Sequence, residues 1–177
     1  MKRALVLGCG LVGHAMARDL AADGRFEVTA ADKSRDRLDR LRGTPRLAPL
    51  ESDLGDPAEL RRLVDRHDLV VGAMPSRLGR STLRTVVEAG KPFADISFMA
   101  EDPLELGDLA RRTGAVAVVD CGLAPGLSNL LAAAAVRDVG RAKKVEIYVG
   151  GRPRVRRWPY DYKAPFAPAD VIEEYVR

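Results

Sequence analysis

The sequence predicts an α/β protein: a doubly wound parallel sheet followed by the start of a second, α+β domain. Three observations predict this fold class. A glycine series, Gly8-x-Gly10-x-x-Gly13, lies between an apolar run and a helical pattern. Strand-like and helix-like segments then alternate six times as far as residue 119. Beyond residue 120 the alternation gives way to a turn rich in glycine and proline, which opens a helix of small residues.

The six predicted strands are mostly short apolar runs with little polar alternation, as in strands buried on both faces of a sheet. The third is a weak strand candidate. In chain order the strands, with their exits, are expected at residues 4–7, 26–31, 46–50, 68–75, 93–98 and 115–119.

A helix is expected between each pair of strands, because apolar residues recur there at helical spacing. The first ends at Gly24, the second is short and charged after Ser34, and the last ends at Gly114. Two helices share one start signal, an aspartate N-cap, a proline at N1 and a glutamate at N3. These starts are Asp56-Pro57-Ala58-Glu59 and Asp102-Pro103-Leu104-Glu105.

The strand–glycine turn–helix unit indicates a dinucleotide-binding Rossmann site. Gly8 allows a tight turn, Gly10 leaves space for a pyrophosphate, and Gly13 lets the helix pack close to the strand. The helix N-terminus, at Leu11 and Val12, offers unpaired N–H groups and a positive dipole end to the phosphates. The alternative is that the glycines only make a turn.

Asp32 ends the second strand, 19 positions after Gly13. A carboxylate there accepts hydrogen bonds from the adenosine ribose and repels a 2′-phosphate, so the predicted cofactor is NAD. Lys33 and Arg35 follow at once and partly offset that repulsion, which keeps NADP as the alternative. The other interpretation of Asp32 is a cap of the next helix.

Loops after the carboxyl ends of strands line the cofactor crevice of such a sheet. Ala73, Met74 and Pro75, at the exit of the fourth strand, are therefore candidates to flank the nicotinamide half. Met74 is equally suited to the core, and Pro75 to stopping the strand. Asp53, after the third strand, is a candidate neighbour of the adenine or a turn residue.

Composition narrows the class of protein. The 177 residues carry a net charge of +4 and 46% hydrophobic residues, enough for a real core. The sequence has no apolar segment long enough to predict a membrane span. Because the first predicted strand begins almost at residue 1, no signal peptide is expected. The basic residues are not accompanied by a nucleic-acid-binding motif. Two cysteines give no disulfide framework, which fits the cytoplasm. His14 and His67 lack partners at ligand spacing, so no metal is expected.

Several motifs together resemble the saccharopine dehydrogenase-like family, which includes saccharopine reductases and lysine 6-dehydrogenases. The resemblance covers the whole chain and about the first half of a typical member. Besides the glycine series it rests on Asp95-Ile96-Ser97, Asp120-Cys121-Gly122-Leu123-Ala124-Pro125-Gly126, Tyr148-Val149-Gly150-Gly151, Tyr162-Lys163-Ala164-Pro165-Phe166 and Asp170-Val171-Ile172. Arg152 and the pair Ser76-Arg77 depart from the family's pattern, which bears on the substrate.

The resemblance implies an NAD(P)-dependent enzyme of lysine metabolism that oxidises a carbon–nitrogen bond of an amino acid, or reduces an imine in reverse. The proton-handling candidates are Lys163, whose alternative is an ordinary surface lysine, and Asp120 with Cys121, whose thiol alternatively only fills space. Tyr162 donates to a substrate carboxylate or only packs.

The resemblance also sets the expected domains: residues 1–122 bind NAD(P), and residues 123–177 begin a substrate and dimerisation domain. A seventh strand is expected at 144–149 and a further helix at 168–176. That helix has an apolar face and no stop signal, so the chain is expected to be truncated. The resemblance implies a homodimer when the protein is full length.

Two other functions compete with this enzyme. One is a dinucleotide-binding module, or fragment, without turnover, because the chain supplies few walls for a substrate. The other, an epimerase or carbonyl reductase, needs a Tyr-x-x-x-Lys pair that the sequence lacks.

Overall fold

The computed structural model describes residues 1–150, 153–156 and 158. The chain divides into two units, Met1–Val119 and Asp120–Arg177, which are described separately below. The division falls three residues before the predicted boundary, and the predicted role of each domain stays a prediction.

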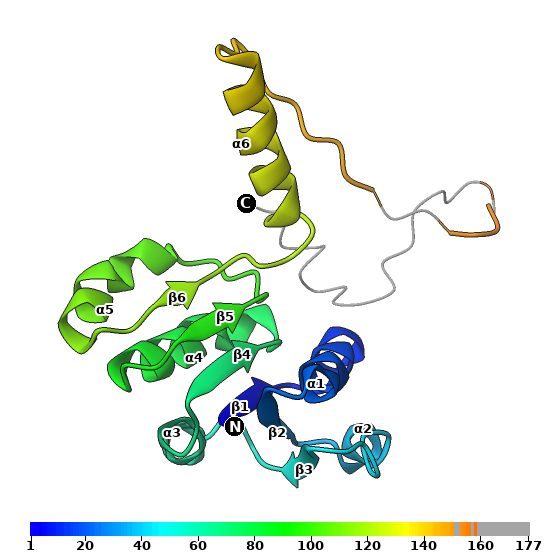
Figure 1. Ribbon diagram of the computed structural model, residues 1–177, viewed down its shortest axis with the longest axis vertical. Coiled ribbons are helices and arrows are strands. Elements are labelled where there is room, and N and C mark those ends of the chain that lie inside the picture. Colours follow the sequence, from blue (N-terminus) through cyan, green and yellow to red (C-terminus); the bar gives the residue numbers. More distant parts are fainter. Residues whose placement is uncertain (151–152, 157, 159–177) are drawn as a thin grey trace. The chain divides into compact units, whose positions relative to one another are not determined.

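Six parallel strands form the sheet of the first unit, in the order β3-β2-β1-β4-β5-β6 (Figure 1). The order reverses between β1 and β4, which makes their carboxyl ends the switch point where such sheets bind ligands. The predicted doubly wound sheet is therefore confirmed. Its strands are β1 (Lys2–Leu7), β2 (Phe26–Asp32), β3 (Leu47–Glu51), β4 (Leu69–Gly72), β5 (Phe93–Asp95) and β6 (Ala117–Val118).

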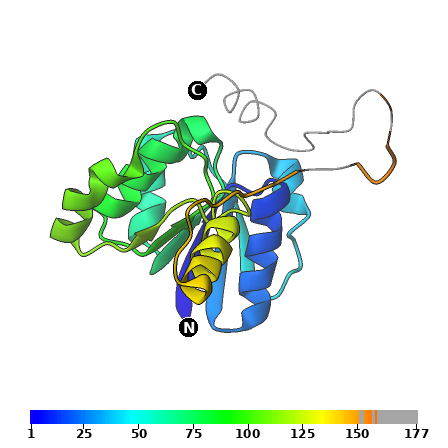
Figure 2. The ribbon, with the colours of Figure 1, turned by 90° about the horizontal axis from the view of Figure 1, so that it is seen from above.

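Helices cover both faces of this sheet (Figures 1 and 2). Helices α1 (Leu11–Asp23) and α2 (Arg35–Asp39) pack on one face. The other face carries α3 (Pro57–Asp65), α4 (Ser76–Glu88), the 3₁₀ turn η1 (Pro103–Leu106) and α5 (Gly107–Thr113).

Strand β1 lies at the centre of two hydrophobic clusters, because alternate side chains of a strand point to opposite faces. Leu5 and Leu7 pack in the cluster with α3 and α4, whereas Ala4 and Val6 pack in the cluster with α1 and α2. All four side chains are fully buried. The uninterrupted apolar run therefore belongs to a strand covered on both sides, as predicted.

Both predicted aspartate caps are present. Asp56 accepts the N–H of Ala58 and Asp102 accepts that of Leu104, each at 2.9 Å. The helix after Asp102 nevertheless begins as the 3₁₀ turn η1 and continues as α5. Gly24 and Gly114 end α1 and α5 in the left-handed conformation, as predicted.

Three predicted strands need correction. β5 stops at Asp95, because its carboxylate accepts the N–H of Ser97 (3.2 Å) and turns the chain. β6 is a two-residue edge strand with a single neighbour, so little fixes its ends. The seventh strand, at residues 144–149, is wrong: among the described residues no strand pairs with this segment.

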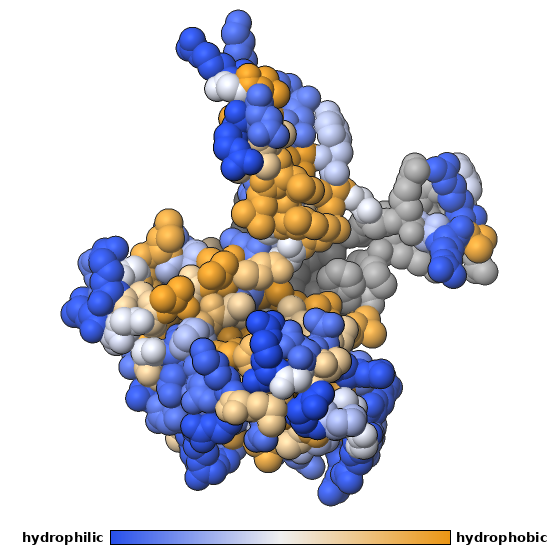
Figure 3. Space-filling model, viewed as in Figure 1, coloured by the Kyte–Doolittle hydropathy of each residue, from blue (hydrophilic) through white to orange (hydrophobic). Residues whose placement is uncertain are grey.

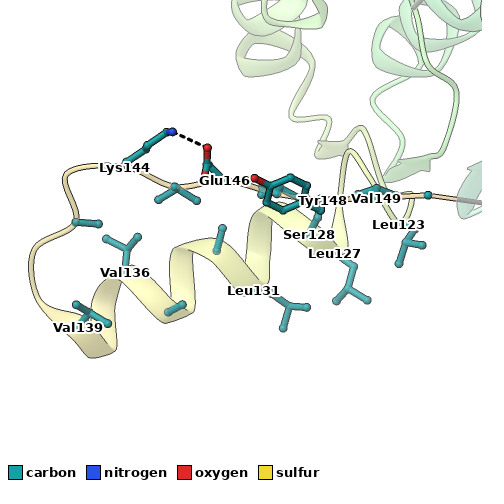
Figure 4. Close-up of a pocket in the computed structure, with 16 residues that line it drawn as sticks. Leu123, Leu127, Ser128, Leu131, Val136, Val139, Lys144, Glu146, Tyr148 and Val149 are labelled. Atoms are coloured by element: carbon teal, nitrogen blue, oxygen red, sulfur yellow. Dashed lines mark ion pairs between the residues drawn. The ribbon is translucent and has the colours of Figure 1, made fainter.

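The second unit contains α6 (Leu127–Val139), a helix with several exposed hydrophobic side chains. Figure 3 shows hydrophobic residues gathered along it. A groove of about 910 Å³ lies between α6 and residues 144–150, lined by side chains such as Leu127, Leu131 and Tyr148 (Figure 4). Lys144 and Glu146 form an ion pair of 2.5 Å at its rim. The predicted helix at 168–176 lies outside the described residues.

Candidate functional site

The glycine turn between β1 and α1 is packed between the ends of two neighbouring strands. Gly8 has a φ of +89°, and its N–H donates to the carbonyl of Ala31 in β2 at 2.9 Å. A Cβ on Gly8 would lie 2.5 Å from the carbonyl oxygen of Ala73, directly after β4. A Cβ on Gly13 would lie 1.9 Å from the carbonyl oxygen of Gly8. Gly8 and Gly13 are therefore required, because a backbone carbonyl oxygen lies too close to leave room for a side chain at either position.

Gly10 differs from the other two glycines, because open space surrounds it. It caps α1 with a φ of −66°, and no atom lies within 4 Å of the position that its Cβ would take. Leu11 and Val12 follow in the first helical turn, 70% and 40% exposed, and this turn carries no acidic residue. A helix N-terminus with open space beside it and no acidic residue in its first turn suits an anionic group such as a pyrophosphate.

Asp32 is buried, and its carboxylate holds two backbone segments together. Oδ2 accepts the N–H of Cys9 at 2.7 Å, and Oδ1 accepts the N–H of Ser34 at 2.8 Å. Nη1 of Arg37 lies 3.5 Å from Oδ2. The carboxylate therefore ties the glycine turn to the turn between β2 and α2, a role that the sequence pattern did not indicate.

Cys9 is buried within this arrangement. Its Sγ lies 3.7 Å from the carbonyl oxygen of Ala31, and only 2% of the residue is exposed. Burial, and then the charge of Asp32, raises the pKa of the Cys9 thiol to about 12.

Replacing Asp32 with alanine is expected to destabilise the first unit by about 2 kcal/mol. The substitution leaves the Cys9 N–H, and partly the Ser34 N–H, without an acceptor, and an unsatisfied buried donor costs about 1–3 kcal/mol. Urea unfolding measures the change, with Asp36→Ala, at an exposed position in the helix α2 that follows, as the control. Equal unfolding midpoints for the two variants would refute the anchoring role.

The exit of β4 is fixed by Asp95, the last residue of β5, and by Ser97 after it. Oγ of Ser97 lies 2.8 Å from Oδ1 of Asp95 and 3.1 Å from the carbonyl oxygen of Met74. Gly72 makes room for this contact, because a Cβ there would lie 2.2 Å from Oδ1 of Asp95. The Asp95-Ile96-Ser97 motif therefore shapes the loop that carries the predicted nicotinamide neighbours.

Of those neighbours, Ala73 and Met74 are partly buried and Pro75 is exposed at the N-cap of α4. Met74 also packs against the core cluster, which agrees with its alternative interpretation. Contact of the three residues with a nicotinamide stays a prediction.

The third strand ends at a polar turn. Oδ1 of Asp53 accepts the N–H of Gly55 at 2.9 Å, as in a turn-forming aspartate. The preceding Ser52 donates to Glu59 of α3 at 2.9 Å, and Arg62 pairs with the same carboxylate at 2.6 Å. The hydrogen bonds from Arg62 and then Ser52 lower the pKa of Glu59 from 4.5 to about 2.

Acid is expected to remove the contribution of Glu59 to stability. Because its pKa is lowered in the folded state, this contribution is fully present above about pH 4.5 and is lost as the pH falls toward 2. The urea midpoints of the wild type and Glu59→Gln should therefore differ most near pH 6 and converge toward pH 2. A difference that stays constant with pH would contradict this assignment.

The predicted catalytic residues fall in the second unit. Asp120 has a φ of +54° and Cys121 is exposed. They open a tight loop in which a Cβ on Gly126 would lie 2.1 Å from the carbonyl oxygen of Gly122. Tyr162 and Lys163 lie outside the described residues, so the catalytic assignment stays a prediction.

Neither metal-binding nor membrane-spanning features occur in the part of the chain that the structure describes. No group of three or more His, Cys, Asp or Glu side chains there is arranged to hold a metal ion. None of the helices described there has the length and apolar character needed to cross a bilayer.

Comparison with known proteins points to one family. A family model described as the saccharopine dehydrogenase NADP binding domain matches residues 4–118. The chain is 25% identical over 158 residues to the saccharopine dehydrogenase (NADP(+), L-glutamate-forming) of Schizosaccharomyces pombe. It is 27% identical over 157 residues to the protein of the same name from Pyricularia oryzae. Each match covers 86% of this chain and 35% of the relative.

A solved structure shares the fold. The apo saccharopine dehydrogenase (L-Glu forming) of Saccharomyces cerevisiae matches with a TM-score of 0.72 at 22% identity, over 80% of this chain and 32% of that one. The chain thus spans about a third of the length of these relatives.

Proposed function

Because the chain belongs to the family of saccharopine dehydrogenase NADP-binding domains, we propose that it binds NADP(H) for an amino-acid oxidoreductase. The reaction is hydride transfer to or from a carbon–nitrogen bond of a saccharopine- or lysine-type substrate, through an imine. One observation carries the proposal: the family match spans the glycine turn, where Gly10 leaves open space beside an uncovered helix N-terminus.

The family confirms a nicotinamide dinucleotide and favours NADP over the NAD that Asp32 suggested. The sequence argument assumed that Asp32 presents its carboxylate to the ribose. Instead, only 6% of the side chain is exposed and both oxygens accept backbone N–H groups. The carboxylate is therefore engaged by the protein backbone, and the positive charge of Arg37, 3.5 Å from Oδ2, offsets part of its repulsion of a 2′-phosphate.

The residues of the first unit would bind and orient the dinucleotide. The N–H groups of Leu11 and Val12 point from the start of α1 toward the expected pyrophosphate. Met74, held through Ser97, would position the loop beside the reactive ring. When bound, the nicotinamide accepts or supplies the hydride. Proton transfer falls to Lys163, Asp120 or Cys121 and substrate binding to Tyr162, on the strength of the resemblance.

We also propose the compartment and the binding partners of the protein. We place the protein in the cytoplasm, because its two cysteines give no disulfide framework and Cys9 is buried as a free thiol. The partners are a small amino-acid substrate and, in the full-length protein, a second copy. Neither nucleic acid nor membrane is proposed as a partner.

The test combines binding with turnover. Calorimetry with NADPH and NADH measures binding, and the nicotinamide absorbance band follows saccharopine- and lysine-dependent reduction of NADP. Binding with turnover supports the full proposal. Binding without turnover would favour the alternative, a dinucleotide-binding module. Failure to bind either dinucleotide would refute the proposed function.

A further inference from the structure

Basic side chains are concentrated where β2 passes into α2. Five of the ten residues from 33 to 42 are lysine or arginine. Two of them pair with acidic residues other than Asp32: Nε of Arg35 lies 3.7 Å from Glu51, which lies beside Asp32 in β3, and Nε of Arg42 lies 2.5 Å from Asp39. Of these three arginines, Arg37 is the one whose guanidinium approaches Asp32, the last residue of β2.

The end of β2 is where a dinucleotide-binding sheet meets the adenosine ribose. Nη1 of Arg37 lies 3.5 Å from Oδ2 of Asp32, a long contact that leaves the rest of the guanidinium fork available. The Arg37 side chain is 53% exposed, whereas that of Asp32 is 6% exposed. The arginine is therefore accessible to a bound group, whereas little of the carboxylate is.

We propose that Arg37 is the specificity-determining residue of this site and binds the 2′-phosphate of NADP(H). The planar fork of an arginine matches phosphate oxygens and forms charge-assisted hydrogen bonds with them. Asp32, fixed by Cys9 and Ser34, serves as the anchor beneath the ribose and holds Arg37 over it. This inference rests on the proposed function, because it requires a dinucleotide in the crevice.

The experiment titrates the 177-residue protein with NADPH, NADH, 2′,5′-ADP and 5′-ADP by calorimetry. For Arg37→Ala, we expect the affinity for NADPH and 2′,5′-ADP to fall about 10- to 100-fold, the range for hydrogen bonds to charged groups. The affinity for NADH and 5′-ADP should change less than about 3-fold, because these ligands lack the phosphate. Arg37→Lys should lose part of the preference, since it keeps the charge without the fork.

Arg42→Ala is the matched control, because Arg42 is also exposed but pairs with Asp39. It should bind all four ligands as the wild type does. Unchanged NADPH affinity in Arg37→Ala, or equal losses for NADPH and NADH, would overturn the assignment of Arg37. Tighter binding of NADH than of NADPH by the wild type would overturn it too. If the wild type binds neither dinucleotide, the proposed function itself fails, and that result is distinguishable from a failure confined to Arg37.

Discussion

Gly13→Ala is expected to destabilise the first unit by about 3 kcal/mol or more, at the upper end of the range for overpacking. The added Cβ would lie 1.9 Å from the carbonyl oxygen of Gly8 and 3.1 Å from the Cβ of Ala73. The first of these atoms is backbone in a tight turn, so it cannot rotate away. The clash is relieved only if α1 moves off the sheet. Urea unfolding followed by far-UV circular dichroism measures the loss.

Gly10→Ala is the control for this variant. It changes the same loop, but no atom lies within 4 Å of the new Cβ and the φ of −66° suits any residue. The cost should not exceed about 1 kcal/mol, the difference between glycine and alanine at an N-cap. If Gly13→Ala unfolds at the same urea concentration as Gly10→Ala, the tight packing of α1 against the turn is wrong.

Gly10→Val is expected to abolish dinucleotide binding, with a loss of affinity of at least about 100-fold, while the fold stays intact. The branched side chain would fill the open space beside the N-terminus of α1, which the pyrophosphate needs. Calorimetry with NADPH measures the loss, and the urea midpoint shows that the protein is still folded.

Gly107→Val is the matched control for binding. Gly107 also begins a helix, and a Cβ there meets only Arg111 side-chain atoms at 3.8 Å or more, far along the chain from the glycine turn. It should bind NADPH normally. Wild-type affinity in a folded Gly10→Val protein would mean that the phosphates bind elsewhere.

Local signals in the sequence were sufficient for most of the fold. The Asp56-Pro57 and Asp102-Pro103 starts specify their caps within three residues, so they were predictable without tertiary information. The glycine turn was equally predictable, because its spacing is tied to one strand–turn–helix geometry. Strand β1 was also predictable, because a short apolar run in a chain of alternating strands and helices indicates a strand buried on both faces.

Contacts between distant residues could not be predicted in this way. The carboxylate of Asp32 is held by Cys9, 23 positions earlier, and that hydrogen bond depends on how β1 and β2 align. Gly72 offered a signal that was missed: a glycine inside an apolar strand indicates close approach of another group, here Asp95. The expected strand at 144–149 failed because its pattern describes one strand, whereas a strand also requires a neighbour.

The buried thiol of Cys9 can serve as a chemical reporter of the glycine turn in which it lies. A thiol-specific reagent reacts with thiolate, and with a pKa of about 12 and almost no exposed surface Cys9 supplies little of it in the folded protein. Cys121 is exposed and would be modified early, leaving Cys9 as the slow site. The rate of that slow modification then measures how often the glycine turn opens at Cys9. A ligand bound at the turn would lower the rate at which Cys9 is modified, and this measurement does not depend on any catalysed reaction.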